Sequence, residues 1–179
     1  MSYCIYKAWG EMQCVSPPKK KDVLLESFID MESTDIDILK PYQGNTLDEL
    51  ASLLRLLQSL SAPPHTILFQ MRSYQQPDGT FQVPTRGSWL YLPAGRFERL
   101  DKIKASNSSK PINFNDITRA VYIGKGTQLE LYEKYAYESM LQRYTTGDTS
   151  IVLDLTNLFK GDMSVSSVVV ENTSYVVNK

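Results

Sequence analysis

Apolar and polar residues alternate along the stretch from Asn115 to Met140, around which we expect the rest of the chain to fold. A period of two is typical of β-strands, so the pattern predicts two strands, or one kinked strand, around Gly124-Lys125-Gly126. Glycine reaches positive φ values and lets another backbone come close, which predicts a turn or bulge at this break. One predicted face carries Val121, Ile123, Leu129 and Leu131, and the other carries Ala120, Tyr122, Gln128, Glu130 and Tyr132.

The strongest helix signal lies between Thr46 and Leu60. Thr46 and Glu49 have the spacing of a capping box, in which the N-cap residue and a side chain three residues later satisfy free amides of the first turn. Leucines recur at helical spacing through this segment, and Pro63-Pro64 ends the pattern. Because the apolar stripe is wide, we expect the helix to be buried on more than one side.

Strand patterns lie on both sides of this helix. They occur at residues 2–15, 23–31, 66–72 and 88–92. Residues 165–177 predict a terminal hairpin, and a strand followed by a short helical turn is predicted at 151–160. Strands interrupted by one strong helix indicate an α+β fold, in which a mainly antiparallel sheet packs against the helix from Thr46 to Leu60, with one or two short helices elsewhere. With 179 residues and 42% hydrophobic content, we expect one domain over residues 1–179, without a flexible basic N-terminal extension.

Charge is unevenly distributed, although the net charge is only -1. Residues 86–125 contain eight basic and three acidic side chains, whereas residues 22–49 contain eight acidic side chains and one lysine. A molecule with opposite poles can attract anionic surfaces with one side and its own copies with the other, although ordinary solvated surfaces also show such segregation. We expect contacts with lipid headgroups, or nonspecific contacts with RNA phosphates, from Arg96, Arg99, Lys102, Lys104 and Lys110.

The loop from Ser73 to Arg86 carries apolar side chains beside a turn signal, Pro77-Asp78-Gly79. Apolar residues on such a loop either fold back onto the core or form an exposed contact for another protein or a bilayer. If the second alternative holds, the contact between copies of the chain would use Gln75, Pro77, Phe81 and Val83.

The sequence offers few residues for catalysis or metal binding. His65 is the single histidine and follows two prolines at the predicted helix end, where a surface or helix-terminus role is the simplest interpretation. Two cysteines and one histidine do not make a structural zinc set, and no carboxylate stands two residues before any lysine, as a D/E-x-K nuclease motif requires. We therefore expect no enzymatic activity and no cofactor, although carboxylates could still converge from distant segments.

Two segments resemble the corresponding regions of rhabdovirus matrix proteins. One is Arg119 to Met140, RAVYIGKGTQLELYEKYAYESM, in which a strand and a Lys-Gly-Thr turn lead into an alternating strand. The other is Gly87 to Gly95, GSWLYLPAG, an aromatic-Leu-Pro segment upstream of it. The order of a capped helix, a strand and an exposed loop between Thr46 and Met140 is also similar to that family.

The resemblance implies a non-enzymatic viral structural protein. Such a protein associates with itself, condenses the ribonucleoprotein nucleocapsid and attaches peripherally to an anionic membrane during assembly and budding. It would be found in the virion and the host cytoplasm, with nuclear entry left open. The chain departs from the family pattern because it starts in a predicted strand, and lysines follow Pro17-Pro18 where a P-P-x-Y motif would need a tyrosine. These departures suit a short form from a plant-infecting virus, and they question recruitment of host budding factors and polymerisation through an N-terminal peptide.

An acidic segment around Met31 offers a further candidate. In some vesiculovirus matrix proteins a methionine amid acidic residues blocks host nuclear export, and Asp30, Met31 and Glu32 are similar to that motif. The alternative is that Met31 packs in the fold. For the whole chain, the alternative function is a soluble adaptor that binds one host protein and blocks host gene expression or defence. An adaptor would be monomeric in low salt, whereas a matrix protein would form salt-sensitive oligomers.

Overall fold

The computed structural model describes residues 3–8, 11–15, 36–60, 62–155 and 164–173. Within these residues the chain is mostly antiparallel β-sheet with one α-helix, α2 (Leu47–Ser59), which confirms the predicted α+β class. One short 3-10 turn, η1 (Tyr135–Tyr137), is described as well. The helical turn predicted near residues 155–159 lies almost wholly outside the described residues.

Helix α2 begins as the sequence predicts. The Thr46 side chain accepts a hydrogen bond from the Glu49 amide at 3.2 Å and donates one to the Glu49 carboxylate at 2.8 Å. Both contacts come from the capping-box pair, although here the carboxylate binds the Thr46 hydroxyl rather than its amide. The leucines at the two ends, Leu47 and Leu60, are exposed, so burial of the helix is concentrated in its middle.

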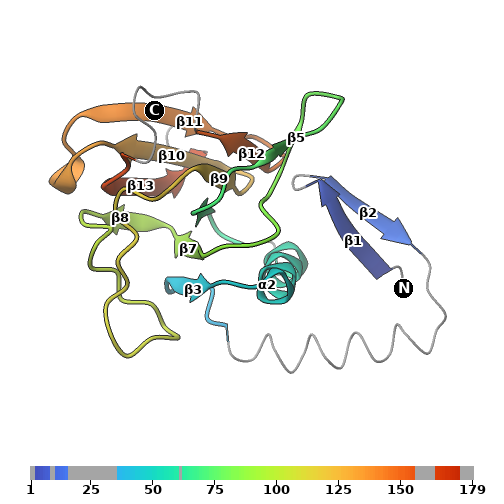
Figure 1. Cartoon of the computed structure of the whole chain (residues 1–179), viewed down its shortest axis with the longest axis horizontal. Helices are drawn as coiled ribbons and strands as arrows, with labels where there is room; N and C mark the ends of the chain where they lie inside the picture. Colours follow the sequence, from blue (N-terminus) through green and yellow to red (C-terminus); the bar gives the residue numbers. More distant parts are fainter. Residues whose placement is uncertain (1–2, 9–10, 16–35, 61, 156–163, 174–179) are drawn as a thin grey trace.

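The larger sheet has five antiparallel strands, and helix α2 packs against it (Figure 1). In spatial order its strands are β12 (Ile151–Asp154), β9 (Ala120–Ile123), β4 (His65–Phe69), β7 (Trp89–Pro93) and β3 (Tyr42–Gly44). Strand β4 is buried at every position because it faces two cores: Ile67 and Phe69 point to the helix side, and Leu68 points to the other side. This sheet is therefore the middle layer of the fold.

The second sheet covers the opposite face of the middle layer. Its strands, in spatial order, are β11 (Met140–Thr145), β10 (Thr127–Tyr132), β13 (Ser167–Asn172) and β8 (Gly95–Phe97). Leu129, Leu131, Val168 and Val170 pack between the sheets with Leu68, Leu90 and Val121 of the middle layer. Two hairpins complete the described strands: β1 (Tyr3–Ala8) with β2 (Glu11–Val15), and β5 (Tyr74–Gln75) with β6 (Phe81–Gln82).

The alternating stretch expected at the centre of the fold forms two strands in different sheets. Strand β9 pairs with β4 and β12 in the middle layer, whereas β10 pairs with β11 and β13 in the second sheet. Residues 124–126 carry the chain from one layer to the other, with Gly126 at a φ of 65°. The two-strand interpretation is thus confirmed, and the single kinked strand is excluded.

The ends of the chain differ from the sequence-based prediction in one respect. Residues 167–172 form strand β13, which pairs with the distant strands β10 and β8, so the expected terminal hairpin is wrong over these residues. The strand predicted at 23–31 lies outside the described residues.

Candidate functional site

Four of the five basic residues predicted to bind phosphates lie on the loop between β8 and β9, over residues 98–119, here called the basic loop, and the fifth, Arg96, lies on β8. Lys102, Lys104 and Lys110 are exposed on the basic loop. Within the described part of the chain none of these three ammonium groups forms an ion pair. They are therefore free to contact an external anion.

The two arginines at the start of this region are already engaged. Arg99 donates two hydrogen bonds to Asp101, at 3.0 and 2.8 Å, and its guanidinium lies 4.5 Å from the ring centre of Tyr135. The hydrogen bond with Asp101 raises the pKa of Arg99, and the same contact lowers the pKa of Asp101. Arg96 lies 4.4 Å from the ring centre of Tyr137 and 3.8 Å from the Glu171 carboxylate. Both arginines are half-exposed, but their charge is partly compensated within the protein.

The basic loop is fastened to the edge of the middle sheet. The Ser106 amide donates to the carbonyl of Pro41 at 2.7 Å, and the Gln43 amide donates to the Asn107 side chain at 3.0 Å. Beneath the lysines, Ile103 and Phe114 are buried between the two sheets. Alternation along the loop therefore points Lys102 and Lys104 outward while Ile103 anchors the backbone.

The hairpin predicted to join copies of the chain is only partly available for contact. Gln75 and Pro77 are exposed on β5 and its turn, and Phe81 on β6 is half-buried against the core. Val83 is fully buried, so it is a core residue and not a contact residue while the fold is intact. Of the two alternatives for this loop, folding back onto the core holds for Val83 and in part for Phe81.

The acidic motif Asp30, Met31 and Glu32 lies outside the described residues. The surface or helix-terminus role expected of His65 is wrong, because this side chain is 4% exposed and belongs to strand β4. Its ring stacks on Tyr122 at 5.8 Å between centres and lies 5.9 Å from Tyr91.

Hydrogen bonding fixes the tautomer of His65, and burial disfavours its charged form. Nδ1 lies 2.8 Å from the Pro63 carbonyl, and a carbonyl can only accept, so Nδ1 carries the proton. Nε2 is buried without a partner. Burial lowers the pKa of His65, and the hydrogen bond to Pro63 offsets this only in part. The ring is therefore held in the neutral form, with an unprotonated Nε2.

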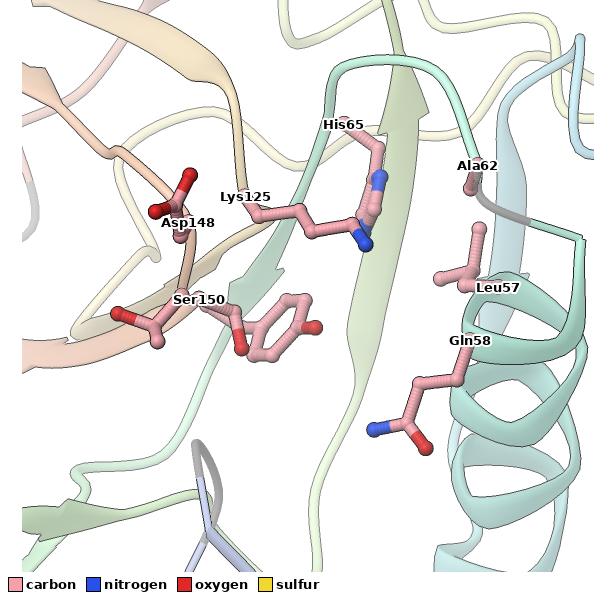
Figure 2. A pocket seen from close by; sticks show the side chains of 9 residues that line it. Leu57, Gln58, Ala62, His65, Lys125, Asp148 and Ser150 are labelled. Atoms are coloured by element: carbon pink, nitrogen blue, oxygen red, sulfur yellow. The ribbon is translucent and has the colours of Figure 1, made fainter.

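A cleft next to His65 was not foreseen from the sequence. It has a volume of about 220 Å³ and lies between the end of α2, the crossover 124–126 and residues 148–150 (Figure 2). Its lining residues are Leu57, Gln58, Ala62, His65, Tyr122, Lys125, Asp148, Thr149 and Ser150. These residues come from four separate segments and share no local motif. The cleft could be predicted from the sequence only if the strand pairing were already known.

The side chains in Figure 2 divide the cleft into two sides. Lys125 extends from the crossover toward helix α2, and Gln58 points back from the helix. Asp148 and Ser150 lie on the side away from the helix. A wider hollow of about 430 Å³ shares Ala62, Lys125 and Asp148 with the cleft.

The described residues offer neither a metal site nor a membrane-spanning helix. Over the described ranges, no three His, Cys, Asp or Glu side chains converge as a metal ion would require. None of the helices described there has the length and apolar character needed to span a bilayer.

Comparison with known proteins gives limited similarity. No protein-family model and no curated protein sequence matches the chain. A solved structure described as "Evolution of the eye lens beta-gamma-crystallin domain fold" is 15% identical, with a TM-score of 0.43, over 62% of this chain and 88% of that one. The N-terminal domain of protein S is 18% identical, with a TM-score of 0.37, over 60% of this chain and 96% of that one.

Proposed function

We propose that this protein is a non-catalytic structural protein that attaches peripherally to anionic membranes through the loop of residues 98–119. The observation that supports the proposal is the set of exposed lysines, Lys102, Lys104 and Lys110, which lack a carboxylate partner among the described residues. Their loop is held to β3 by hydrogen bonds, so the charges can be presented without ordering a free segment.

Electrostatic attachment of this kind is weak for one copy. Each basic residue near an anionic leaflet contributes about 1 kcal/mol, so three lysines contribute roughly 3 kcal/mol, or about a hundredfold in affinity. Binding by many tethered copies is far stronger because the second contact is effectively intramolecular. The proposal therefore includes self-association at the surface.

The exposed tip of the β5–β6 hairpin, with Gln75 and Pro77, is the candidate contact between copies. A self-associating, membrane-attached protein that also condenses a nucleocapsid is what the resemblance to rhabdovirus matrix proteins implies. That viral role, including contact with the nucleocapsid and with RNA, is part of the proposal.

Flotation with vesicles tests the attachment surface. Vesicles containing phosphatidylserine should carry the wild-type protein upward at low salt, and the triple variant Lys102→Glu, Lys104→Glu, Lys110→Glu should remain at the bottom. A matched control, Arg86→Glu, Lys125→Glu, Lys134→Glu, makes the same change in charge at exposed positions outside the loop and should still float. Equal loss in both variants, or retention by the loop variant, would refute the assignment.

Two further measurements separate membrane attachment from its alternatives. Binding to single-stranded RNA that exceeds binding to vesicles at the same salt would favour a nucleic-acid role instead. Sedimentation at low and high salt tests self-association: wild-type oligomers should dissociate as salt rises, and Gln75→Glu with Pro77→Glu should weaken them. A protein that stays monomeric at every salt concentration would favour the single-partner adaptor.

A further inference from the structure

We propose that the cleft beside His65 binds a small zwitterionic molecule with an apolar group, which is the chemistry of a free amino acid. This inference is independent of membrane attachment, because the cleft uses none of the lysines of the basic loop. Three features of the cleft support this ligand: its size, the charges in its wall and its apolar side.

The volume limits the ligand to a small molecule. Ligand pockets for drug-sized compounds measure about 300–1,000 Å³, and this cleft measures about 220 Å³. At about 30 Å³ per water molecule it holds roughly seven waters. A nucleotide or a peptide would extend out of this cleft into the wider hollow or the solvent, whereas a single amino acid fits within it.

The wall carries one positive and one negative side chain, Lys125 and Asp148. They form no ion pair with each other or with another charged group that the structure describes. Because these two opposite charges share a cleft without pairing, each can bind an oppositely charged group of the same ligand. Lys125 would bind a carboxylate and Asp148 an ammonium group.

The remaining wall suits the rest of such a molecule. Leu57, Ala62 and the Tyr122 ring provide apolar contact. The Gln58 amide points into the cleft from helix α2 and can bind a second carboxylate oxygen (Figure 2). An apolar side group between Leu57 and Tyr122 would add affinity by leaving water.

His65 gives the cleft an internal reporter. It is the single histidine of the chain, it lines the cleft, and its ring stacks on Tyr122. A ligand that contacts Tyr122 or Lys125 changes the surroundings of the imidazole. The ring resonances of one labelled histidine therefore report occupancy without ambiguity of assignment.

Titration of histidine-labelled protein with leucine is the direct test. Leucine should shift the His65 signals saturably, whereas glycine, 4-methylpentanoate and isopentylamine should each bind at least tenfold more weakly. Glycine lacks the apolar group, and the other two lack the ammonium and the carboxylate respectively. Absence of a saturable shift with leucine at millimolar concentration, or equal binding of all four compounds, would overturn the proposal.

Substitutions then assign the two charges. Lys125→Met should weaken leucine and 4-methylpentanoate but leave isopentylamine unchanged. Asp148→Asn should weaken leucine and isopentylamine but leave 4-methylpentanoate unchanged. Both residues are exposed, so the variants should keep the thermal melt of the wild type, and Lys134→Met is the matched control. Leucine binding that neither variant changes would place the ligand elsewhere and refute this site.

Discussion

The imidazole of His65 occupies the space that a side chain at position 124 would need. A Cβ atom added at Gly124 would lie 2.5 Å from Nε2 of His65, and the Gly124 amide donates to the His65 carbonyl at 2.9 Å. Close approach therefore requires glycine at position 124. His65 at the start of β4 and Gly124 directly after β9 pack as one unit at the sheet crossover.

Replacing Gly124 with alanine should destabilise the protein. Overpacking of a filled interior typically costs about 1–3 kcal/mol, and we expect Gly124→Ala to fall in this range because the His65 ring is itself enclosed. Gly147→Ala is the matched control, since a Cβ there meets nothing within 4 Å and the backbone is not left-handed. Urea denaturation measures both variants. A loss at Gly124 that persists undiminished in a His65→Ala background would show that the ring is not the cause.

Local sequence signals predicted the elements of this fold better than their assembly. The capping pair Thr46 and Glu49 and the alternation on either side of Gly124 depend on neighbouring residues, and both predictions are confirmed. The division of β9 and β10 between two sheets depends on long-range pairing, which alternation alone does not encode. The sequence also could not distinguish Lys102, which is exposed and unpaired among the described residues, from Arg99, which is occupied by Asp101.

The same reasoning explains why His65 was misplaced. Two prolines before it suggested an exposed connection, but the pattern of β4 begins at His65 itself and continues through Phe69. Its burial depends on the gap that Gly124 leaves across the strand pair. That relationship between positions far apart in the chain becomes visible only once the strands are paired.

Stability should fall as the pH drops below the ordinary pKa of histidine. In the unfolded chain His65 has a pKa of about 6.5, and in the folded protein burial lowers it. The unfolded state therefore binds more protons below that pH, so the contribution of neutral His65 is complete above about pH 6.5 and is lost as pH falls toward the folded pKa. The expected slope is at most about 1.4 kcal/mol per pH unit.

The variant His65→Gln isolates this effect. Glutamine can donate to the Pro63 carbonyl but does not titrate, so all other groups contribute equally to the two proteins. Between pH 7.5 and 5.5 the free energy of unfolding should fall more for the wild type than for His65→Gln. The difference between the two proteins should therefore shrink as the pH is lowered. Parallel curves for the two proteins would mean that the folded pKa of His65 is unperturbed.

The N-cap of helix α2 should contribute a measurable share of stability. Thr46 accepts from the Glu49 amide, and the Trp89 indole donates to the Thr46 carbonyl at 3.2 Å, so the cap also ties the helix to β7. Thr46→Ala should cost about 0.5–2 kcal/mol, because it leaves an amide of the first turn without its partner. Thr46→Ser keeps the hydroxyl and should stay close to the wild type in the same thermal or urea unfolding experiment. Equal losses in both variants would attribute the effect to the methyl group.

The carboxylate of Glu130 on β10 depends on its neighbour across the strand pair. Arg143 of β11 lies directly opposite. Its Nε donates to Oε2 of Glu130 at 2.8 Å, its Nη2 lies 2.6 Å from the same oxygen, and the Tyr132 hydroxyl donates to Oε1 at 2.8 Å. The Glu130 side chain is 11% exposed, whereas the Arg143 side chain is 53% exposed. Loss of the arginine would thus leave an enclosed charge with one remaining donor.

Arg143→Met should therefore lower the free energy of unfolding by about 1–3 kcal/mol, the range expected when a buried polar group loses its partner. This loss is smaller than that for a fully buried ion pair because the arginine is half-exposed. Arg143→Lys should recover only part of this loss because an ammonium cannot place two nitrogens on Oε2 of Glu130 as the guanidinium does. The double variant Arg143→Met, Glu130→Gln should be more stable than Arg143→Met alone, since the neutral amide still accepts from Tyr132 and carries no charge to desolvate. Urea denaturation of the wild type, Arg143→Met, Glu130→Gln and the double variant measures this coupling. Strictly additive losses would show that the pair is a solvated surface contact with no energetic role.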